Sequence, residues 1–305
     1  MNTILRTKNI TKKFGDHMSV DHVNLSIQTG EIYGFLGPNG AGKTTLMKMM
    51  TNLVYPTSGE VELFGEPLKA DSFELLRNVG SIIEYPILYG HLSAKETLEL
   101  HCAYMGYKQT SFIPSALELV GLAQVGDKPV QSYSLGMKQR LGLARAIVTR
   151  PKLLILDEPI NGLDPVAIKE MRRIFKFLQE EFGMTLFISS HILGEIEHVA
   201  DTVGIIQNGK LIEEVTIEEL RSSGASTIFH VSNAHQASKL LQEKFNLVNI
   251  IVLDSTKLQI NDSNLNQQLF TKTLILNGID IIEVVNKRHS LEDYFIEKME
   301  GGIIR

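Results

Sequence analysis

Apolar and polar positions alternate near the start of the chain. Val23, Leu25 and Ile27 follow the two-residue period of a half-buried strand, and residues 31–37 form a short apolar strand that ends at a glycine. After a glycine-rich segment, residues 44–54 have the pattern of a helix. The amino-terminal part is therefore predicted to contain strands, then a glycine-rich loop, then a helix.

From residue 92 to about 150 the apolar positions recur near the 3.6-residue period of helices. The next apolar run, residues 153–156, does not alternate, which is expected for a strand buried on both faces of a parallel sheet. Residues 185–188 have the same character, and residues 166–182 between the two runs form an amphipathic helical pattern. This succession of strands and helices indicates an α/β core.

A second, smaller domain follows. Asn208-Gly209 between apolar runs predicts a hairpin, and the first domain is expected to end near residue 222. The remaining residues have the order strand, helix, strand, strand, helix, strand, which is that of a ferredoxin-like α+β unit. A last helix is predicted over residues 290–299.

Composition narrows the classes of function. The chain has 305 residues, 43% of them hydrophobic, and a net charge of −5, which suits a large core and disfavours a general nucleic-acid binder. The chain has a single cysteine, Cys102, so no disulfide can form within it and a cytosolic location is permitted. Cys102 is interpreted as a buried apolar residue. No run of ~20 apolar residues or signal peptide is found, so a membrane role would require a partner.

The glycine-rich segment matches the phosphate-binding P-loop, G-x-x-x-x-G-K-[ST]. Its residues are Gly37, Pro38, Asn39, Gly40, Ala41, Gly42, Lys43 and Thr44. The glycines allow backbone N–H groups to turn towards phosphate oxygens, and the N-terminus of the next helix favours the same anion. Lys43 is expected to reach the β- and γ-phosphates, Thr44 to bind Mg²⁺ and Thr45 to hold the α-phosphate. The loop alone does not choose among nucleoside triphosphatases and kinases.

Polar residues follow both buried strands. Asp157 is expected at the carboxyl edge of the sheet, where it can hold Mg²⁺ or its water. Glu158 is expected to face the water that attacks the γ-phosphate, as a base or an orienting group. His191, at the end of Ser189-Ser190-His191, is expected to contact the γ-phosphate and the same water. Glu158 and His191 are thus the predicted catalytic residues.

With these residues in place, residues 1–222 resemble the ABC-transporter ATPase family. Ser134-Leu135-Gly136-Met137-Lys138 stands where the family has its LSGGQ signature; Ser134 and Gly136 match. Residues 161–165 resemble the family's D-loop, which contains Asp164 here, and Phe14 matches the aromatic residue that stacks on adenine.

The resemblance implies a fold and an assembly. The fold would be a P-loop ABC ATPase core with an antiparallel β subdomain, a helical signature subdomain at about 92–150, and an accessory α+β domain at 223–305. In the family the signature binds the γ-phosphate of ATP held by the opposite subunit. Ser134, Gly136 and Asp164 would then complete the nucleotide sites of a head-to-tail dimer, formed with a second copy or a paralogue, which ATP closes and hydrolysis opens.

One departure from the family narrows the resemblance. Glu84 stands where the family usually has Gln; a carboxylate can bind Mg²⁺ but cannot donate a hydrogen bond. Glu84 therefore joins Thr44 and Asp157 as a predicted metal ligand. The segment GSIIEYP, the altered signature and the SLEDYF tail resemble the ATPase subunits of bacterial bacitracin- and lantibiotic-resistance exporters. This resemblance implies an ATPase at the cytoplasmic face of the membrane, bound to an integral membrane permease and to no nucleic acid.

Other interpretations stay open. An ABC-type ATPase without a permease could act on ribosomes or DNA, although such roles favour basic segments. A P-loop kinase or GTPase is a third alternative. The GTPase is disfavoured because residues 161–164 lack the Lys of the guanine-reading N-K-x-D motif, and the kinase is disfavoured by the signature and the helix that follows it. The tail, residues 225–305, is either a dimer-stabilising or permease-docking appendage, which is favoured, or a regulatory module. The sequence does not name the transported substrate.

Overall fold

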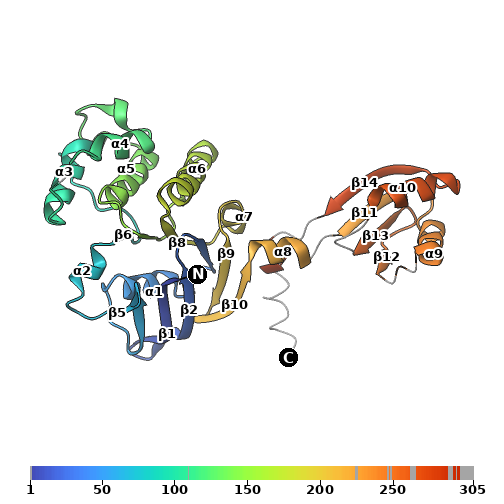
Figure 1. Ribbon diagram of the computed structural model, residues 1–305, viewed down its shortest axis with the longest axis horizontal. Coiled ribbons are helices and arrows are strands. Elements are labelled where there is room, and N and C mark those ends of the chain that lie inside the picture. The colour runs from blue at the N-terminus through green and yellow to red at the C-terminus, as the bar shows by residue number, and fades with distance from the viewer. Residues whose placement is uncertain are drawn as a thin grey trace. The chain divides into compact units, whose positions relative to one another are not determined.

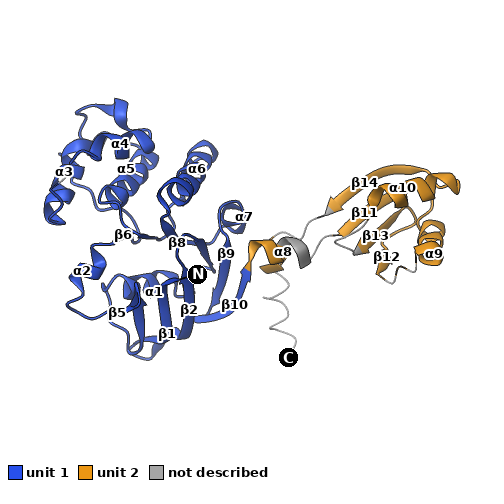
Figure 2. Cartoon of the chain, viewed as in Figure 1, with its two compact units in different colours: residues 1–215 blue, residues 216–305 orange. Residues whose placement is uncertain are grey.

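The computed structural model describes residues 2–108, 110–223, 226–245, 247, 249–261, 266–287, 291–292 and 294–295. The chain divides into two compact units, residues 1–215 and 216–305 (Figure 2). The expected boundary near residue 222 falls inside helix α8 (Ile217–Ser223), which belongs to the second unit. Every helix within the described ranges falls short of the length and apolar character that a membrane span requires.

The first unit contains an antiparallel sheet with the strand order β2-β1-β4-β5. Its strands are β1 (Thr3–Phe14), β2 (His17–Gln28), β4 (Ser58–Leu63) and β5 (Glu66–Pro67). Leu5 lies opposite Ile27 on one side and Leu63 on the other, so three fully or nearly fully buried apolar side chains cross the sheet. The alternation of Val23, Leu25 and Ile27 therefore predicted strand β2 correctly, whereas the two-residue strand β5 was not predicted.

The second sheet of this unit has the order β10-β9-β3-β8-β7-β6. Its strands are β3 (Ile32–Leu36), β6 (Val79–Ile82), β7 (Leu153–Leu156), β8 (Thr185–Ser190), β9 (Thr202–Gln207) and β10 (Lys210–Thr216). Strands β6, β7, β8, β3 and β9 run parallel, and all four residues of β7 are buried, as the unbroken apolar run predicted. The parallel pairing brings the carboxyl ends of β3, β7 and β8 to one edge.

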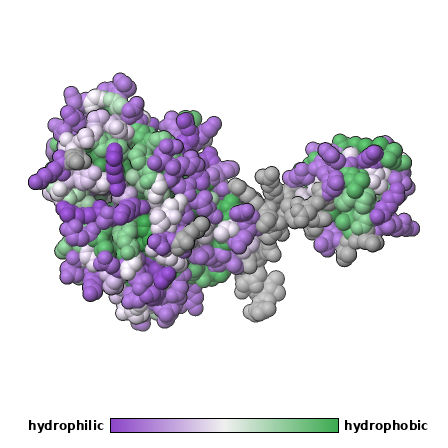
Figure 3. All heavy atoms as spheres, viewed as in Figure 1, coloured by the Kyte–Doolittle hydropathy of each residue, from purple (hydrophilic) through white to green (hydrophobic). Residues whose placement is uncertain are grey.

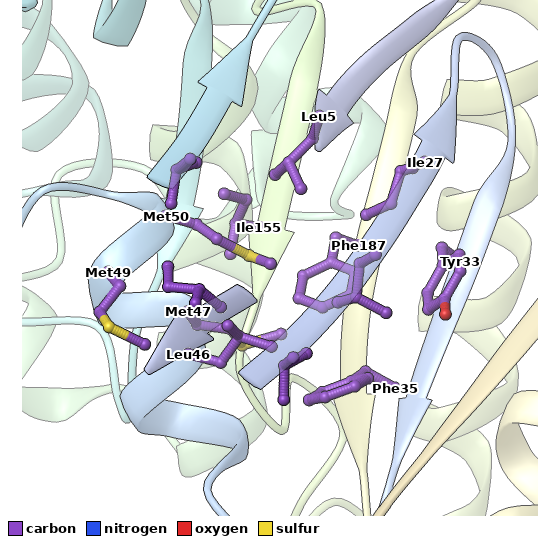
Figure 4. Packing of buried hydrophobic residues seen from close by; sticks show 14 of the residues in the cluster. Leu5, Ile27, Tyr33, Phe35, Leu46, Met47, Met49, Met50, Ile155 and Phe187 are labelled. Atoms are coloured by element: carbon purple, nitrogen blue, oxygen red, sulfur yellow. The ribbon is translucent and has the colours of Figure 1, made fainter. Parts of the chain in front are cut away.

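Helix α1 (Lys43–Met50) packs its apolar side chains into the core beside these sheets. Leu46, Met47 and Met50 lie with Phe35, Phe187 and other buried side chains (Figure 4). The helix ends at Met50, although the pattern predicted it to residue 54. Asn52 has a φ of 60°, and the N–H groups of Leu53 and Val54 both bond to the Lys48 carbonyl, so the chain turns away.

A helical region is formed by α3 (Ala94–Tyr104), α4 (Ile113–Leu119) and α5 (Leu135–Ile147), with two short 3₁₀ turns at Ala123–Val125 and Val130–Ser132. These helices gather at one end of the first unit (Figure 1). Ser93 and Glu96 form a capping box that starts α3. Cys102 is buried in α3, and burial raises the pKa of its thiol, which agrees with the predicted apolar role.

The first unit also contains the helices α2 (Phe73–Leu76), α6 (Pro165–Phe182) and α7 (Leu193–Glu197). The α6 helix confirms the amphipathic pattern; Asp164 caps its first turn and Gly183, with a φ of 62°, ends it. The hairpin between β9 and β10 turns at Asn208 and Gly209, which both have positive φ. The short α7 and α8 were not predicted, because five to seven residues carry little periodic signal.

The second unit confirms the ferredoxin-like order. Its elements are β11 (Ser226–Val231), α9 (Ala234–Phe245), β12 (Ile250–Val252), β13 (Lys257–Asn261), α10 (Gln267–Leu276) and β14 (Ile281–Lys287). The sheet order is β12-β13-β11-β14 with antiparallel neighbours, and Leu241 and Phe270 from the two helices share a core with Phe229. The helix predicted over residues 290–299 lies outside the described residues, apart from four positions at 291–295.

Gly80 tests the contact between the parallel sheet and the helical region. A Cβ at Gly80, in β6, would lie 2.1 Å from the Ala146 carbonyl oxygen of α5. Gly80→Ala is expected to lower the free energy of unfolding by about 1–3 kcal/mol through overpacking. The matched control is Gly194→Ala in α7, where no heavy atom lies within 4 Å of the added Cβ, so little change or a slight gain is expected.

Denaturation followed by circular dichroism checks this pair of variants. Equal denaturation midpoints for Gly80→Ala and the wild-type chain would contradict the prediction, because they would show that β6 and α5 accommodate the added methyl group without a loss of stability.

Candidate functional site

The loop between β3 and α1 has a backbone that only glycine adopts easily. Gly40 and Gly42 have φ values of 80° and 108°. A Cβ on Gly42 would lie 2.3 Å from the Ser19 carbonyl oxygen, and one on Gly37 would lie 2.3 Å from the Ile206 carbonyl oxygen. Backbone atoms of neighbouring segments therefore pack closely against Gly37 and Gly42, while Pro38, Asn39 and Gly40 are exposed. A side chain at either crowded glycine would displace the backbone that carries the N–H groups.

Lys43, the first residue of α1, extends its side chain back to this loop, and only 6% of its surface is exposed. Its Nζ donates to the carbonyl oxygens of Gly37, at 2.6 Å, and Pro38, at 3.2 Å. The same ammonium lies 3.3 Å from Oε1 of Glu158. The loop carbonyls and Glu158 thus hold a buried cation at the carboxyl edge of β3, where an anion is attracted.

Asp157 collects three hydrogen bonds. Its Oδ2 accepts from the Thr44 hydroxyl, at 2.7 Å, and from the Glu84 backbone N–H, at 3.2 Å, while its Oδ1 accepts from the Ser189 hydroxyl, at 2.6 Å. The carboxylate is only 2% exposed. These bonds join the ends of α1, β6, β7 and β8 at one carboxylate. The hydroxyl of Thr44 and the carboxylate of Asp157 form the kind of oxygen pair that Mg²⁺ prefers.

Glu158 sits in a left-handed turn with a φ of 48°. Its backbone N–H donates to the Ser189 hydroxyl at 2.9 Å, and its Oε2 lies 2.8 Å from Nδ1 of His191. The Glu158 side chain is 18% exposed and that of His191 34%, so both groups reach the surface of the site. One carboxylate therefore touches the Lys43 cation and the His191 imidazole together.

The sequence pattern indicated Ser189 only as a neighbour of His191, with no role of its own. In the structure it links Asp157 to the Glu158 backbone and so sets the geometry of both acids. Its position, two residues before His191 at the end of a buried strand, was the only signal that could have indicated this role.

The backbone and the side chain of Glu84 bind different residues. Its backbone N–H contacts Asp157, but its carboxylate lies 2.7 Å from the Nζ of Lys48, one turn after Thr44 in α1. Glu84 also has a φ of 65°. The structure therefore places the residue beside the predicted metal ligands, with its carboxylate on Lys48 rather than on Thr44 or Asp157.

The other predicted residues are arranged around this centre. Thr45 accepts a hydrogen bond from the Ser19 hydroxyl, at 2.9 Å. Phe14 is 49% exposed, and the Lys12 ammonium lies 4.9 Å from its ring centre, so the ring is available for stacking. Ala41, within the loop itself, is buried.

Ser134, Gly136 and Asp164 form a separate surface. Ser134 caps α5 by accepting from the Met137 N–H, and Asp164 caps α6 by accepting from two N–H groups. The two segments touch, since Leu163 lies 3.6 Å from a Cβ built on Gly136. Within the described part of the chain, no hydrogen bond or ion pair joins these three residues to the P-loop.

The central arrangement suits phosphate chemistry. A glycine-rich loop before a helix N-terminus, with a buried ammonium beside it, can cradle a polyphosphate. A hydroxyl with a carboxylate can hold a divalent cation, and a second carboxylate bonded to an imidazole can accept or direct a proton. Together these groups can cleave a nucleoside triphosphate.

Comparisons with known proteins agree with this chemistry. The family described as ABC transporter matches residues 20–161. The uncharacterized ABC transporter ATP-binding protein YcbN of Bacillus subtilis (strain 168) is 50% identical over 100% of this chain and 99% of its own length. The bacitracin transport ATP-binding protein BcrA of Bacillus licheniformis is 45% identical over the full length of both chains. The lantibiotic transport ATP-binding protein SrtF of Streptococcus pyogenes is 46% identical over 69% of this chain and 90% of its own.

A solved structure shows the same fold. The ATP-binding cassette MJ0796, a dimer in a post-hydrolysis state bound to ADP and Pi, is 25% identical with a TM-score of 0.65 and covers 70% of this chain and 99% of its own. The fold expected from the P-loop and signature is thereby confirmed. From these identities over the full length, this chain belongs to the ATP-binding subunits of ABC transporters, the ABC ATPases.

Proposed function

We propose that this ABC ATPase powers a separate membrane permease that exports, or protects the cell from, a peptide antibiotic of the bacitracin or lantibiotic kind. The observation that carries the ATPase part is the cluster in which Lys43, Glu158 and His191 meet within hydrogen-bonding or ion-pair distance. The substrate class is supported by the printed names of BcrA and SrtF, which describe bacitracin and lantibiotic transport.

Each part of the P-loop region has a proposed task in binding ATP. The backbone N–H groups of residues 37–44 hold the phosphates, and Lys43 contacts the β- and γ-phosphates. Thr45 holds the α-phosphate, and the exposed ring of Phe14 stacks on the adenine. The closely packed glycines keep the loop in shape without the ligand, which reduces the entropy lost on binding.

Thr44 and Asp157 are the proposed protein ligands of Mg²⁺. Their oxygens are already 2.7 Å apart, and Ser189 and the Glu84 N–H fix the carboxylate. Two protein oxygens leave room for phosphate oxygens and water, which is the usual composition of such sites. When bound, Mg²⁺ neutralises charge on the β- and γ-phosphates. Glu84 is proposed as a third ligand, direct or through water, after its carboxylate leaves Lys48.

Glu158 and His191 are the proposed catalytic pair. The left-handed turn directs the Glu158 carboxylate away from the strand and beside the ammonium of Lys43. From there Glu158 can accept a proton from the attacking water, and His191 can hold the carboxylate in place and contact the γ-phosphate.

The signature surface completes the site in a dimer. Ser134, Gly136 and Asp164 are exposed or partly exposed and are proposed to meet the nucleotide and P-loop of the opposite subunit. The N-terminus of α5, which follows Ser134, favours an anion there. The dimeric MJ0796 structure supports this assembly, formed here by two copies of the chain or with a paralogue.

Residues 1–222 are proposed as the nucleotide-binding domain, with the helical signature subdomain at about 92–150, and residues 223–305 as an accessory domain. The ATPase is proposed to sit at the cytoplasmic face of the membrane, held there by its permease. The loop after Glu84 and the helical region are the proposed contact with a cytoplasmic helix of that permease, which would couple hydrolysis to gating.

The first test is a pull-down from detergent-solubilised native membranes. The Glu158→Gln chain, incubated with ATP, is expected to recover a multi-span permease together with two copies of the ATPase. The matched control is the same variant without nucleotide, in which the two copies should not stay closed. Deleting that permease should also increase sensitivity to the peptide antibiotic. Recovery of ribosomes or DNA-repair proteins in place of a membrane protein would exclude the transport function.

A further inference from the structure

Strand β2 passes beside the P-loop directly after the hairpin that carries Phe14. Phe14 pairs with His17 at the turn between β1 and β2, and Ser19 lies two residues further along β2. Hydrophilic residues predominate on the face of the first unit that Figure 3 shows, whereas Phe14 and Met18 of this hairpin are apolar and exposed. Ser19 therefore lies between the proposed adenine site and the buried part of β2, which begins at Val20.

The backbone of Ser19 packs against the P-loop. A Cβ built on Gly42 would lie 2.3 Å from the Ser19 carbonyl oxygen, and a Cβ built on Gly209 would lie 2.9 Å from the same oxygen. Gly209, at the turn between β9 and β10, also donates its N–H to the Ala41 carbonyl oxygen at 3.0 Å. Only glycine allows so close an approach at both positions. Strand β2, the P-loop and the β9–β10 turn therefore meet at Ser19.

The side chain of Ser19 reaches the helix that follows the P-loop. Its hydroxyl donates to Oγ1 of Thr45 at 2.9 Å, across 26 positions of the sequence. Both residues are half-buried, so water competes only in part for this hydrogen bond. A hydroxyl has one hydrogen and two acceptor lone pairs. Because Thr45 accepts from Ser19, the hydrogen of its own hydroxyl remains for a second group.

The usual partner of that hydrogen is already engaged. A threonine in a helix commonly donates to the carbonyl four residues earlier, which for Thr45 is the carbonyl of Ala41. That oxygen already accepts from the Gly209 N–H. Thr45 lies in the first turn of α1, where the N-terminus of the helix attracts an anion. The Thr45 hydroxyl is thus arranged to donate to an anion.

We propose that Ser19 is a positioning residue for ATP, whose hydroxyl orients Thr45 so that Thr45 donates to an oxygen of the α-phosphate. The inference rests on the proposed role of Thr45 and adds the group that sets the direction of its hydroxyl. Hydrogen bonds in series polarise one another, so Ser19 also strengthens the bond from Thr45 to the phosphate. The α-phosphate is common to ATP and ADP and is remote from the bond that is cleaved, so Ser19 acts on affinity.

The first test compares binding with turnover in the purified full-length chain. Ser19→Ala removes the hydroxyl and is expected to weaken the binding of both ATP and ADP about fivefold, with kcat within about twofold of the wild-type value. Ser19→Thr keeps the hydroxyl and should restore both affinities. The matched control is Ser26→Ala, because Ser26 lies near the other end of β2 and its hydroxyl is 3.4 Å from that of Thr3. Calorimetric titration measures the affinities, and phosphate release gives kcat.

Two further measurements show whether Ser19 acts through Thr45. Thr45→Val alone should weaken ATP binding, and adding Ser19→Ala should weaken it by no more than about a further twofold, because the contact is already lost. The α-thio analogue of ATP, in its Rp and Sp forms, replaces one α-phosphate oxygen with sulfur, which is a weak acceptor. The wild-type chain should bind one form more weakly than ATP, and Ser19→Ala should bind that form and ATP with nearly equal affinity.

The outcomes keep this inference apart from the proposed function. If Thr45→Val binds ATP as tightly as the wild-type chain does, the α-phosphate role of Thr45 fails and the inference fails with it. If Thr45→Val weakens ATP binding but Ser19→Ala does not, or if the two losses add, the inference is overturned and the role of Thr45 stands. Thermal melting identifies a loss that is caused by unfolding. Ser19→Thr and Ser19→Val, which are nearly equal in shape and differ in the hydroxyl, then repeat the comparison.

Discussion

Glu158→Gln is expected to reduce the turnover of ATP by about 10²–10⁴-fold while ATP binding persists. The amide keeps the size of the side chain and can still bond to His191, but it cannot accept a proton from water. Lys43 keeps its bonds to the Gly37 and Pro38 carbonyls, so the phosphate-binding loop stays in place. Phosphate release under saturating ATP measures turnover, and gel filtration with ATP is expected to show an accumulating dimer.

The control for this variant is Glu180→Gln, which removes an exposed carboxylate on α6 without touching the site. It should leave both turnover and dimer formation unchanged. Turnover by Glu158→Gln within about threefold of the wild-type rate would show that another group activates the water.

Lys43→Met should weaken ATP binding by about 10²-fold or more, because it removes the one buried cation of the loop at nearly constant side-chain size. It also leaves the Glu158 carboxylate without its partner at 3.3 Å, which places an uncompensated negative charge near the γ-phosphate. Calorimetric titration with ATP and Mg²⁺ measures the affinity, and the residual turnover should fall in parallel.

Lys169→Met, at an exposed position of α6, is the matched control and should bind ATP normally. The two site variants then separate binding from chemistry, since Glu158→Gln should lose turnover with affinity retained and Lys43→Met should lose affinity first. Normal ATP affinity in Lys43→Met would contradict the phosphate-binding role of this lysine.

Local sequence patterns predicted most of the elements because their causes are local. The unbroken apolar run at Leu153–Leu156 requires a strand buried on both faces, and all four residues are buried. The order of elements after residue 225 identified the ferredoxin-like unit, whose four-stranded sheet has the corresponding strand order. The helix after the P-loop was predicted too long, because the turn at Asn52 depends on bonds to Lys48 that no apolar period records.

The roles assigned to the site residues stay predictions, but the tertiary structure shows which of them can act together. The parallel pairing of β7 with β8 brings Ser189 to Asp157 and His191 to Glu158, across more than thirty positions of sequence. The sequence placed Glu84 among metal ligands by analogy, whereas the structure adds Lys48 as the partner of its carboxylate. A partner of this kind is set by how α1 packs beside β6, which the composition of neither segment reveals.

By itself, the sequence determined the class of chemistry and the succession of elements in this protein. The P-loop motif over residues 37–44, the acidic pair after one buried apolar run and the histidine after a second such run each consist of residues close together in the chain. Each can therefore be identified without knowledge of the fold. Only the tertiary structure decided the pairs: Lys43 with Glu158, and Ser189 with both acids. The physical reason is that strand register and helix packing fix distances of a few ångströms between residues far apart in the chain, and those distances are set by the whole core rather than by any local pattern.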